Sequence, residues 1–104
     1  MRHEVVIVFD ARSSLDVPVD ATELPAADAA RRWLDEEFVR LACEPLRASG
    51  KVLTADKLLA VAAEAGSAGF DDEAWRKAFA GAACAAMGRP TVRVDLAAMA
   101  VRAA

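Results

Sequence analysis

Residues 4–10 read Glu-Val-Val-Ile-Val-Phe-Asp, so five consecutive β-branched or aromatic residues stand between two acids. Such side chains favour strands, and successive side chains of a strand point to opposite faces of the sheet. A strand that is apolar on both faces is typical of a sheet with both faces covered. The sequence therefore predicts a central strand near the start of the chain.

Two further segments alternate apolar and other residues with the period of a strand. The first runs from Leu15 to Asp20, and Pro18 restricts it to a sheet edge because proline has no backbone N–H to donate. The second predicts a strand from about Thr91 to Ala100. Its alanine-rich second half could instead be helical, since alanine favours helices over strands.

Three helices are expected in the middle of the chain. The first begins near Pro25, at the first helical position, and ends near Cys43, shortly before Pro45. It places Ala30, Leu34 and other apolar residues on one face at spacings of three and four.

The second and third helices have clearer end signals. The second is predicted to start with Thr54 as its N-cap and to end at Gly66. The third is predicted to start with Asp71 as its N-cap and to end at Gly88.

The order of these elements predicts an α+β fold. A small two- or three-stranded sheet, formed by the N- and C-terminal segments, would be covered by the three central helices. The 104 residues suffice for a single domain, residues 1–104, and are too few for two independent cores.

The first strand also predicts an interaction surface. Helices on one face of the sheet would leave Val6 and Val8 uncovered on the other face. We expect another subunit to supply the missing layer.

The third helix suggests a second part of that interface. From Ala78 to Gly88 it carries no charge, so none of its faces indicates solvent. Ala74, Ala78, Gly81 and Ala85 form a narrow stripe of small residues that permits close approach of another backbone. Packing within the chain and packing against a partner are both open at this point.

Charge patterning argues against several partners. The net charge is −3, and both signs are scattered along the chain, so we expect no nucleic-acid or membrane partner. The chain opens without a basic segment followed by an apolar one, which favours a cytoplasmic, reducing location.

The chemistry of catalysis has little support in the sequence. His3 is the only histidine, and Cys43 and Cys84 are the only cysteines, without metal-ligand or redox spacing. We therefore assign no catalytic residue, no metal ligand and no cofactor, and interpret both thiols as unreactive.

Acidic residues of the first helix are also better explained by structure. Asp35, Glu36 and Glu37 resemble paired carboxylates, but Arg31 and Arg32 stand four residues before two of them. This spacing predicts a solvated ladder of ion pairs instead of an acid–base site.

Three functions follow, in order of preference. The first is a non-catalytic accessory subunit or protein-interaction module that is oligomeric or bound in a complex. The second is a small-molecule binding protein or small enzyme with a site between sheet and helices that uses Arg93, Asp95 or His3. The third is a helix-turn-helix-like DNA-binding regulator, which the acidic start of the third helix disfavours.

Overall fold

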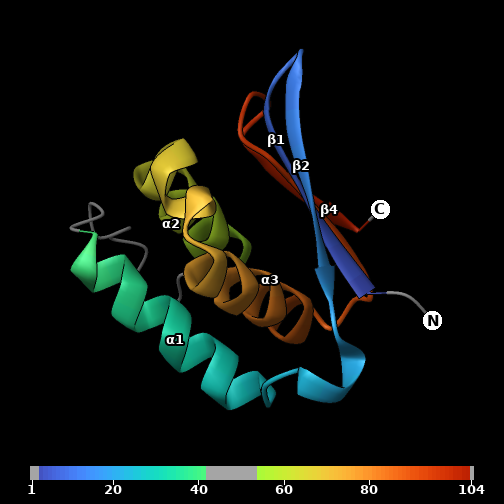
Figure 1. Ribbon diagram of the computed structural model, residues 1–104. Helices are drawn as coiled ribbons and strands as arrows, with labels where there is room; N and C mark the ends of the chain where they lie inside the picture. The colour runs from blue at the N-terminus through green and yellow to red at the C-terminus, as the bar shows by residue number, and fades with distance from the viewer. Residues whose placement is uncertain (1–2, 42–53, 104) are drawn as a thin grey trace.

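The structure is a computed structural model that describes residues 3–41 and 54–103. Two strands, a short 3-10 turn, three helices and two more strands follow one another in these residues (Figure 1). They are β1 (His3–Asp10), β2 (Ser13–Val19), η1 (Ala21–Glu23), α1 (Ala27–Arg40), α2 (Thr54–Asp71), α3 (Glu73–Met87), β3 (Thr91–Asp95) and β4 (Ala100–Ala103).

The α+β class is confirmed, but the sheet has four strands, in the order β2-β1-β3-β4, instead of two or three. β1 pairs with β2 in an antiparallel hairpin and with β3 in parallel, so it is a central strand. β2 is an edge strand, as Pro18 requires.

The predicted third strand is in fact two strands joined by a turn. β3 ends at Asp95, whose carboxylate accepts a hydrogen bond from the Ala98 N–H at 3.0 Å. Met99 has a positive φ of 51°, and the chain returns as β4, antiparallel to β3. The alternation of residue types continues through the turn, and periodicity alone therefore could not reveal the reversal.

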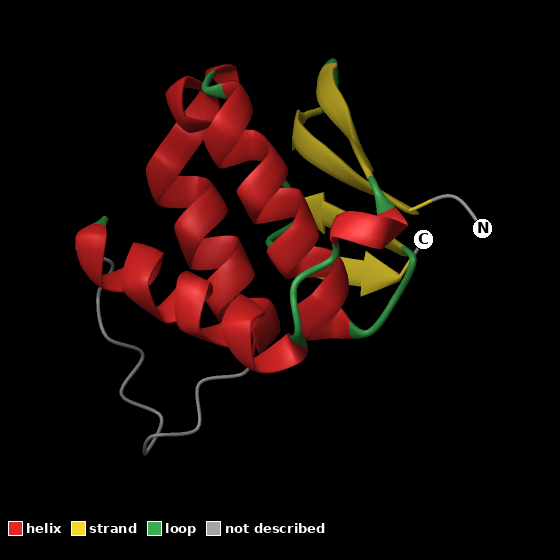
Figure 2. Cartoon of the chain, turned by 60° about the horizontal axis from the view of Figure 1, so that its bottom comes forward, coloured by secondary structure: helices red, strands yellow, loops and turns green. Residues whose placement is uncertain are grey.

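All three helices lie on one side of the sheet (Figures 1 and 2). α2 and α3 contact the strands, and α1 packs against α2 and α3. Five sheet residues that face the helices are fully or almost fully buried. They are Val5, Ile7, Val17, Val92 and Val94. The core therefore lies between the sheet and the α2–α3 pair.

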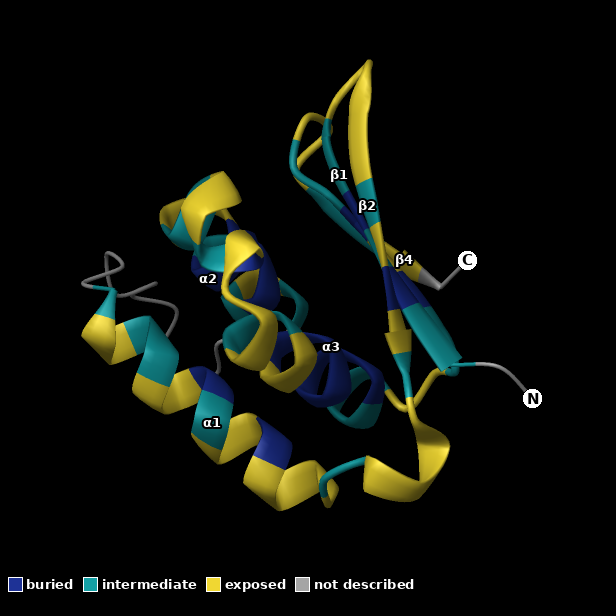
Figure 3. Ribbon diagram, viewed as in Figure 1, coloured by how far each residue is buried: buried dark blue, intermediate teal, exposed yellow. Residues whose placement is uncertain are grey.

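The third helix, α3, is the centre of the molecule (Figure 3). Its six residues from Phe79 to Cys84 are all buried, because α3 lies against the sheet, α1 and α2. The uncharged half of the predicted third helix is thus largely covered by the chain itself.

Aromatic rings join α3 to its neighbours. Trp75 stacks on Phe79 with ring centroids 5.3 Å apart, and Phe70 meets Phe79 edge-on at 5.3 Å. The indole N–H of Trp75 donates to the Glu37 carboxylate of α1 at 2.6 Å. Hydrogen bonds from Arg40 and then from Trp75 hold the pKa of Glu37 below its usual value, although partial burial opposes this.

The helix ends agree with the sequence signals only in part. Gly66 has a positive φ of 59°, but α2 kinks there and continues to Asp71 instead of ending at Gly66 as predicted. Gly88 ends α3 in the left-handed conformation, as predicted. Asp72, and not Asp71, caps α3 by accepting from the Trp75 N–H at 3.2 Å, because α2 continues to Asp71 across a kink at Gly66. Asp71 and Asp72 both suit an N-cap, so the residue types alone could not show which of them caps α3.

The first helix, α1, begins at Ala27, two residues after Pro25. Ala30 and Leu34 are its buried residues, as the apolar spacing predicts. The predicted end near Cys43 lies outside the described residues. α2 is described from Thr54 onward, but without the Thr54 side chain on which the predicted cap depends.

The ion-pair ladder predicted along α1 is not the one observed. Arg31 pairs with Asp28 at 3.7 Å, Arg40 pairs with Glu37, and Asp35 pairs with Lys57 of α2. A spacing of four brings two side chains within reach but does not select one partner among several acids. Within the described residues, two of these pairs lie inside α1 and the third joins α1 to α2.

Candidate functional site

The side of the sheet turned away from the helices is the main candidate surface, and we call it the open face. Its residues follow from strand alternation and register. They are Glu4, Val6 and Val8 of β1, Ser14, Asp16 and Pro18 of β2, Thr91, Arg93 and Asp95 of β3, and Ala100 and Arg102 of β4.

Two valines occupy the middle of the open face. Val6 and Val8 are half-buried, whereas their neighbours Val5 and Ile7 on the helix side are fully buried. The sequence thus identified a strand that is apolar on both faces, and the helices cover only one of them. Val6 and Val8 therefore remain the residues that a second layer would cover.

Charged side chains form a row across the open face at the level of Val6. The register places Asp16 on one side of Val6 and Arg93 on the other, and Arg102 lies directly opposite Arg93. From the β2 edge to the β4 edge, the row therefore consists of an acid on β2, a valine on β1, and one base each on β3 and β4.

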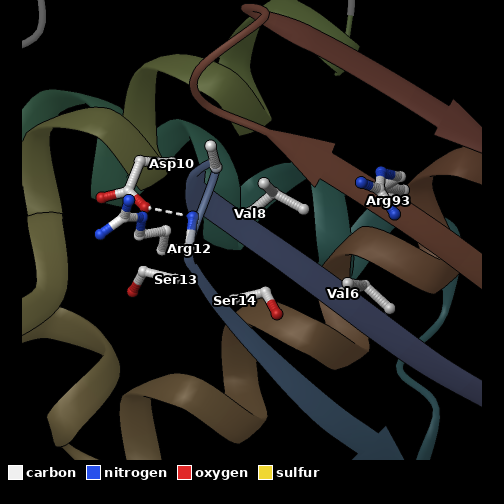
Figure 4. A pocket seen from close by; sticks show the side chains of 8 residues that line it. Val6, Val8, Asp10, Arg12, Ser13, Ser14 and Arg93 are labelled. Carbon is white, nitrogen blue, oxygen red and sulfur yellow. Dashed lines mark hydrogen bonds between the residues drawn. The ribbon is translucent and has the colours of Figure 1, made fainter.

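A shallow cavity of about 240 Å³ opens on the same face at the hairpin end (Figure 4). Val6, Val8, Ser14 and Arg93 line it from three strands. At its far end the Asp10 carboxylate accepts a hydrogen bond from the Arg12 N–H at 2.7 Å, which fixes the hairpin turn. The cavity is a depression of the open face and not a separate site.

The small-residue stripe of α3 does not join this surface. The helices lie on the other side of the sheet, so Ala74, Ala78, Gly81 and Ala85 are separated from Val6 and Val8 by the core. Ala74 and Ala78 are exposed, Ala85 is half-buried, and Gly81 is buried. The six candidate interface residues therefore belong to two different surfaces.

Gly81 is packed closely, but by a proline. A Cβ atom at this position would lie 3.4 Å from the Cδ atom of Pro25. Next to this contact, a groove of about 340 Å³ runs between α1 and α3. Pro25, Ala29 and Trp33 form its α1 side. Sequence reasoning missed this groove, because it depends on how α1 crosses α3.

Of the residues in the alternative enzyme hypothesis, the structure brings together Arg93 and Asp95, which line one shallow cavity of about 410 Å³ on the open face, and it leaves His3 apart from them. Arg93 and Asp95 lie on the open face of β3, whereas His3 lies at the start of β1 on the helix side, opposite Val19. The Nδ1 atom of His3 is buried without a hydrogen-bond partner among the described residues. These three side chains do not form one site.

Cys84 has the surroundings of an unreactive thiol. It is 2% exposed, and its Sγ lies 3.7 Å from the Pro90 carbonyl oxygen, to which it donates weakly. Burial raises its pKa from 9.0 to about 11, because the thiolate loses hydration in this place. Cys43 lies outside the described residues.

We expect Cys84 of the folded protein to resist alkylation by iodoacetamide at about pH 8 and to react faster as the pH rises towards its pKa of about 11. The raised pKa also means that the neutral thiol favours the folded state below pH 9.0 and that this contribution is lost as the pH rises to about 11. Mass spectrometry of the Cys43→Ser variant measures the alkylated fraction. Equal rates for the folded and the denatured protein at about pH 8 would refute this interpretation.

Within residues 3–41 and 54–103, no group of three or more His, Cys, Asp or Glu side chains is arranged to hold a metal ion. No helix in those ranges combines the length and apolar character that a membrane crossing needs. Comparisons of the chain with protein-family models, curated proteins and solved structures find no match. The geometry and chemistry of the surfaces are therefore the basis for a function.

Proposed function

We propose that this protein is a non-catalytic interaction module whose open face binds another protein surface. The observation that carries the proposal is the half-buried pair Val6 and Val8 in the centre of a sheet face that none of the described helices covers. Strands that are apolar on both faces belong to sheets covered on both sides. A protein partner supplies that second cover.

The polar surroundings of the two valines support the same proposal. Asp16, Arg93 and Arg102 are exposed on the same face, around the apolar centre. A dehydrated apolar centre within a polar rim is the usual anatomy of a protein–protein interface.

Small-ligand binding is the second candidate. A cavity of about 500 Å³ lies between the edge strand β2 and α3, lined by Pro18, Val19, Asp20, Glu23, Lys77 and Gly81. Its volume falls within the range of ligand sites. Most of its lining residues are exposed, so a ligand bound there would stay largely hydrated and gain little from burial. The open face is therefore the better supported site.

A lysine in place of Val6 tests the proposal. The charged side chain at the apolar centre would have to lose its water on association, so we expect Val6→Lys to stay folded and to lose its partner. Val39→Lys is the matched control, because Val39 is 77% exposed on α1 and should tolerate lysine without effect on association.

The measurement is the mass of the wild type and of both variants, taken on purified protein and on complexes isolated from the native source. The proposal expects an assembly in the wild type and in Val39→Lys, and a free chain of 11.0 kDa in Val6→Lys. An assembly that persists unchanged in Val6→Lys would exclude the open face as the binding surface.

A further inference from the structure

From the charge order across the open face we infer that its partner is a second copy of this chain, related by a two-fold axis parallel to β1. Asp16 of each copy then faces Arg93 and Arg102 of the other copy. This inference rests on the proposed function, because it names the partner of the same surface.

The arginine pair is the first observation that supports it. Arg93 and Arg102 are directly opposite each other on neighbouring antiparallel strands, and both are exposed. Like charges in this position repel each other. An acidic group placed above both guanidinium groups would remove the repulsion.

The chain itself does not supply that acid within its described residues. All ion pairs observed there join helix residues, namely Asp28 with Arg31, Glu37 with Arg40, Asp35 with Lys57, and Glu73 with Lys77. Glu4 and Asp95 also lie on the open face, but neither forms an ion pair with Arg93 or Arg102 in the described residues. The arginine pair therefore lacks an acidic partner among those residues.

Asp16 of another copy is that complement. The row of charges runs from Asp16 through Val6 to Arg93 and Arg102. A two-fold axis parallel to the strands places the row of one copy over the row of the other copy and reverses its order. Asp16 of each copy then lies over Arg93 and Arg102 of the other copy. A two-fold axis perpendicular to the strands keeps the direction, and would place acid over acid and base over base. The charge order of this row thus favours the two-fold axis parallel to the strands.

The apolar centre fits the same arrangement. Val6 lies between Asp16 and Arg93 in the row, so the reversal brings Val6 of each copy to the middle of the other sheet. Two stacked sheets lie about 10 Å apart, which the valines and the aliphatic parts of the arginines can fill. The contact is isologous, and it closes without leaving an open face on either copy.

Charge exchange between two variants is the test. Asp16→Arg places base over base, and Arg93→Glu combined with Arg102→Glu places acid over acid. We expect each variant alone to lose dimer affinity by about 100-fold or more, because like charges meet twice in a symmetric contact. An equimolar mixture of the two variants restores opposite charges at both contacts, and we expect it to form a one-to-one heterodimer.

Matched variants control for net charge. Glu64→Arg on α2 changes the charge as Asp16→Arg does, and Arg32→Glu with Arg89→Glu changes it as the arginine double variant does. All three control positions are exposed and lie off the open face. We expect these controls to dimerise like the wild type, as native mass spectrometry can show.

Three outcomes would overturn the inference. In the first, the open-face variants dimerise as well as the controls. In the second, they lose the dimer but the mixture does not restore it. In the third, the purified wild type stays at 11.0 kDa while a different protein, lost in Val6→Lys, accompanies it in the native source. That last result would contradict the second-copy inference and support the proposed function, whereas absence of any association would refute both.

Discussion

Replacing Phe79 by alanine is expected to lower the free energy of unfolding by about 3–5 kcal/mol. Phe79 is fully buried on α3, and its ring contacts those of Phe70 and Trp75, both with centroids 5.3 Å away. Alanine would leave a cavity between the sheet and the helices. Since a small domain is stable by only about 5–15 kcal/mol, the variant should unfold at much lower urea concentrations.

Phe79→Leu is the control for this experiment, because leucine keeps most of the apolar volume and should cost about 1.5 kcal/mol or less. Urea denaturation followed by far-ultraviolet circular dichroism measures both variants. A loss of less than about 1 kcal/mol in Phe79→Ala would contradict the position of Phe79 at the centre of the core.

Replacing Val5 by lysine is expected to abolish the folded state. Val5 is fully buried between Val17 of β2 and Val92 of β3, so an ammonium group there would lose its water and gain no charged partner among those neighbours. The cost of such a burial reaches several kcal/mol, which is comparable to the whole stability of a small domain. A thermal melt of Val5→Lys should show no cooperative transition.

Lysine at the adjacent position is the control for Val5→Lys. Val6→Lys puts the same side chain one residue further along β1, on the open face, and should melt as the wild type does apart from any stability due to the partner. A folded Val5→Lys together with an unfolded Val6→Lys would mean that the two faces of β1 are exchanged.

The parts of the fold that depend on local residue type were predictable from the sequence. The run from Val5 to Phe9 indicated a central strand, Pro18 indicated an edge, and Gly88 indicated a helix end, because each property acts within a few residues. Local reasoning also gave the α+β class, whereas the number of strands and their arrangement differ from the prediction.

The remaining details depend on contacts between distant segments. The turn after Asp95 rests on a hydrogen bond from one side chain, which strand alternation does not register. Asp35 pairs with Lys57 of another helix, and no spacing within α1 could select that partner. The groove beside Gly81 exists because Pro25 lies against α3.

The candidate site was likewise predictable from the sequence only in part. Val6 and Val8 were visible in the sequence as the second apolar face of a strand. Their alignment with Asp16, Arg93 and Arg102 requires the strand order β2-β1-β3-β4 and the register of three strand pairs. The order of charges across a sheet is therefore a property of the fold and not of any single segment.

Sedimentation equilibrium of the purified wild-type protein over a wide concentration range shows whether the open face binds a second copy of the chain. Mass action requires the average mass of a reversible dimer to rise with concentration. The account predicts a rise to twice the chain mass of 11.0 kDa, with no larger species, because a two-fold contact closes after one partner has bound. A mass that stays at 11.0 kDa up to the highest concentration would contradict it.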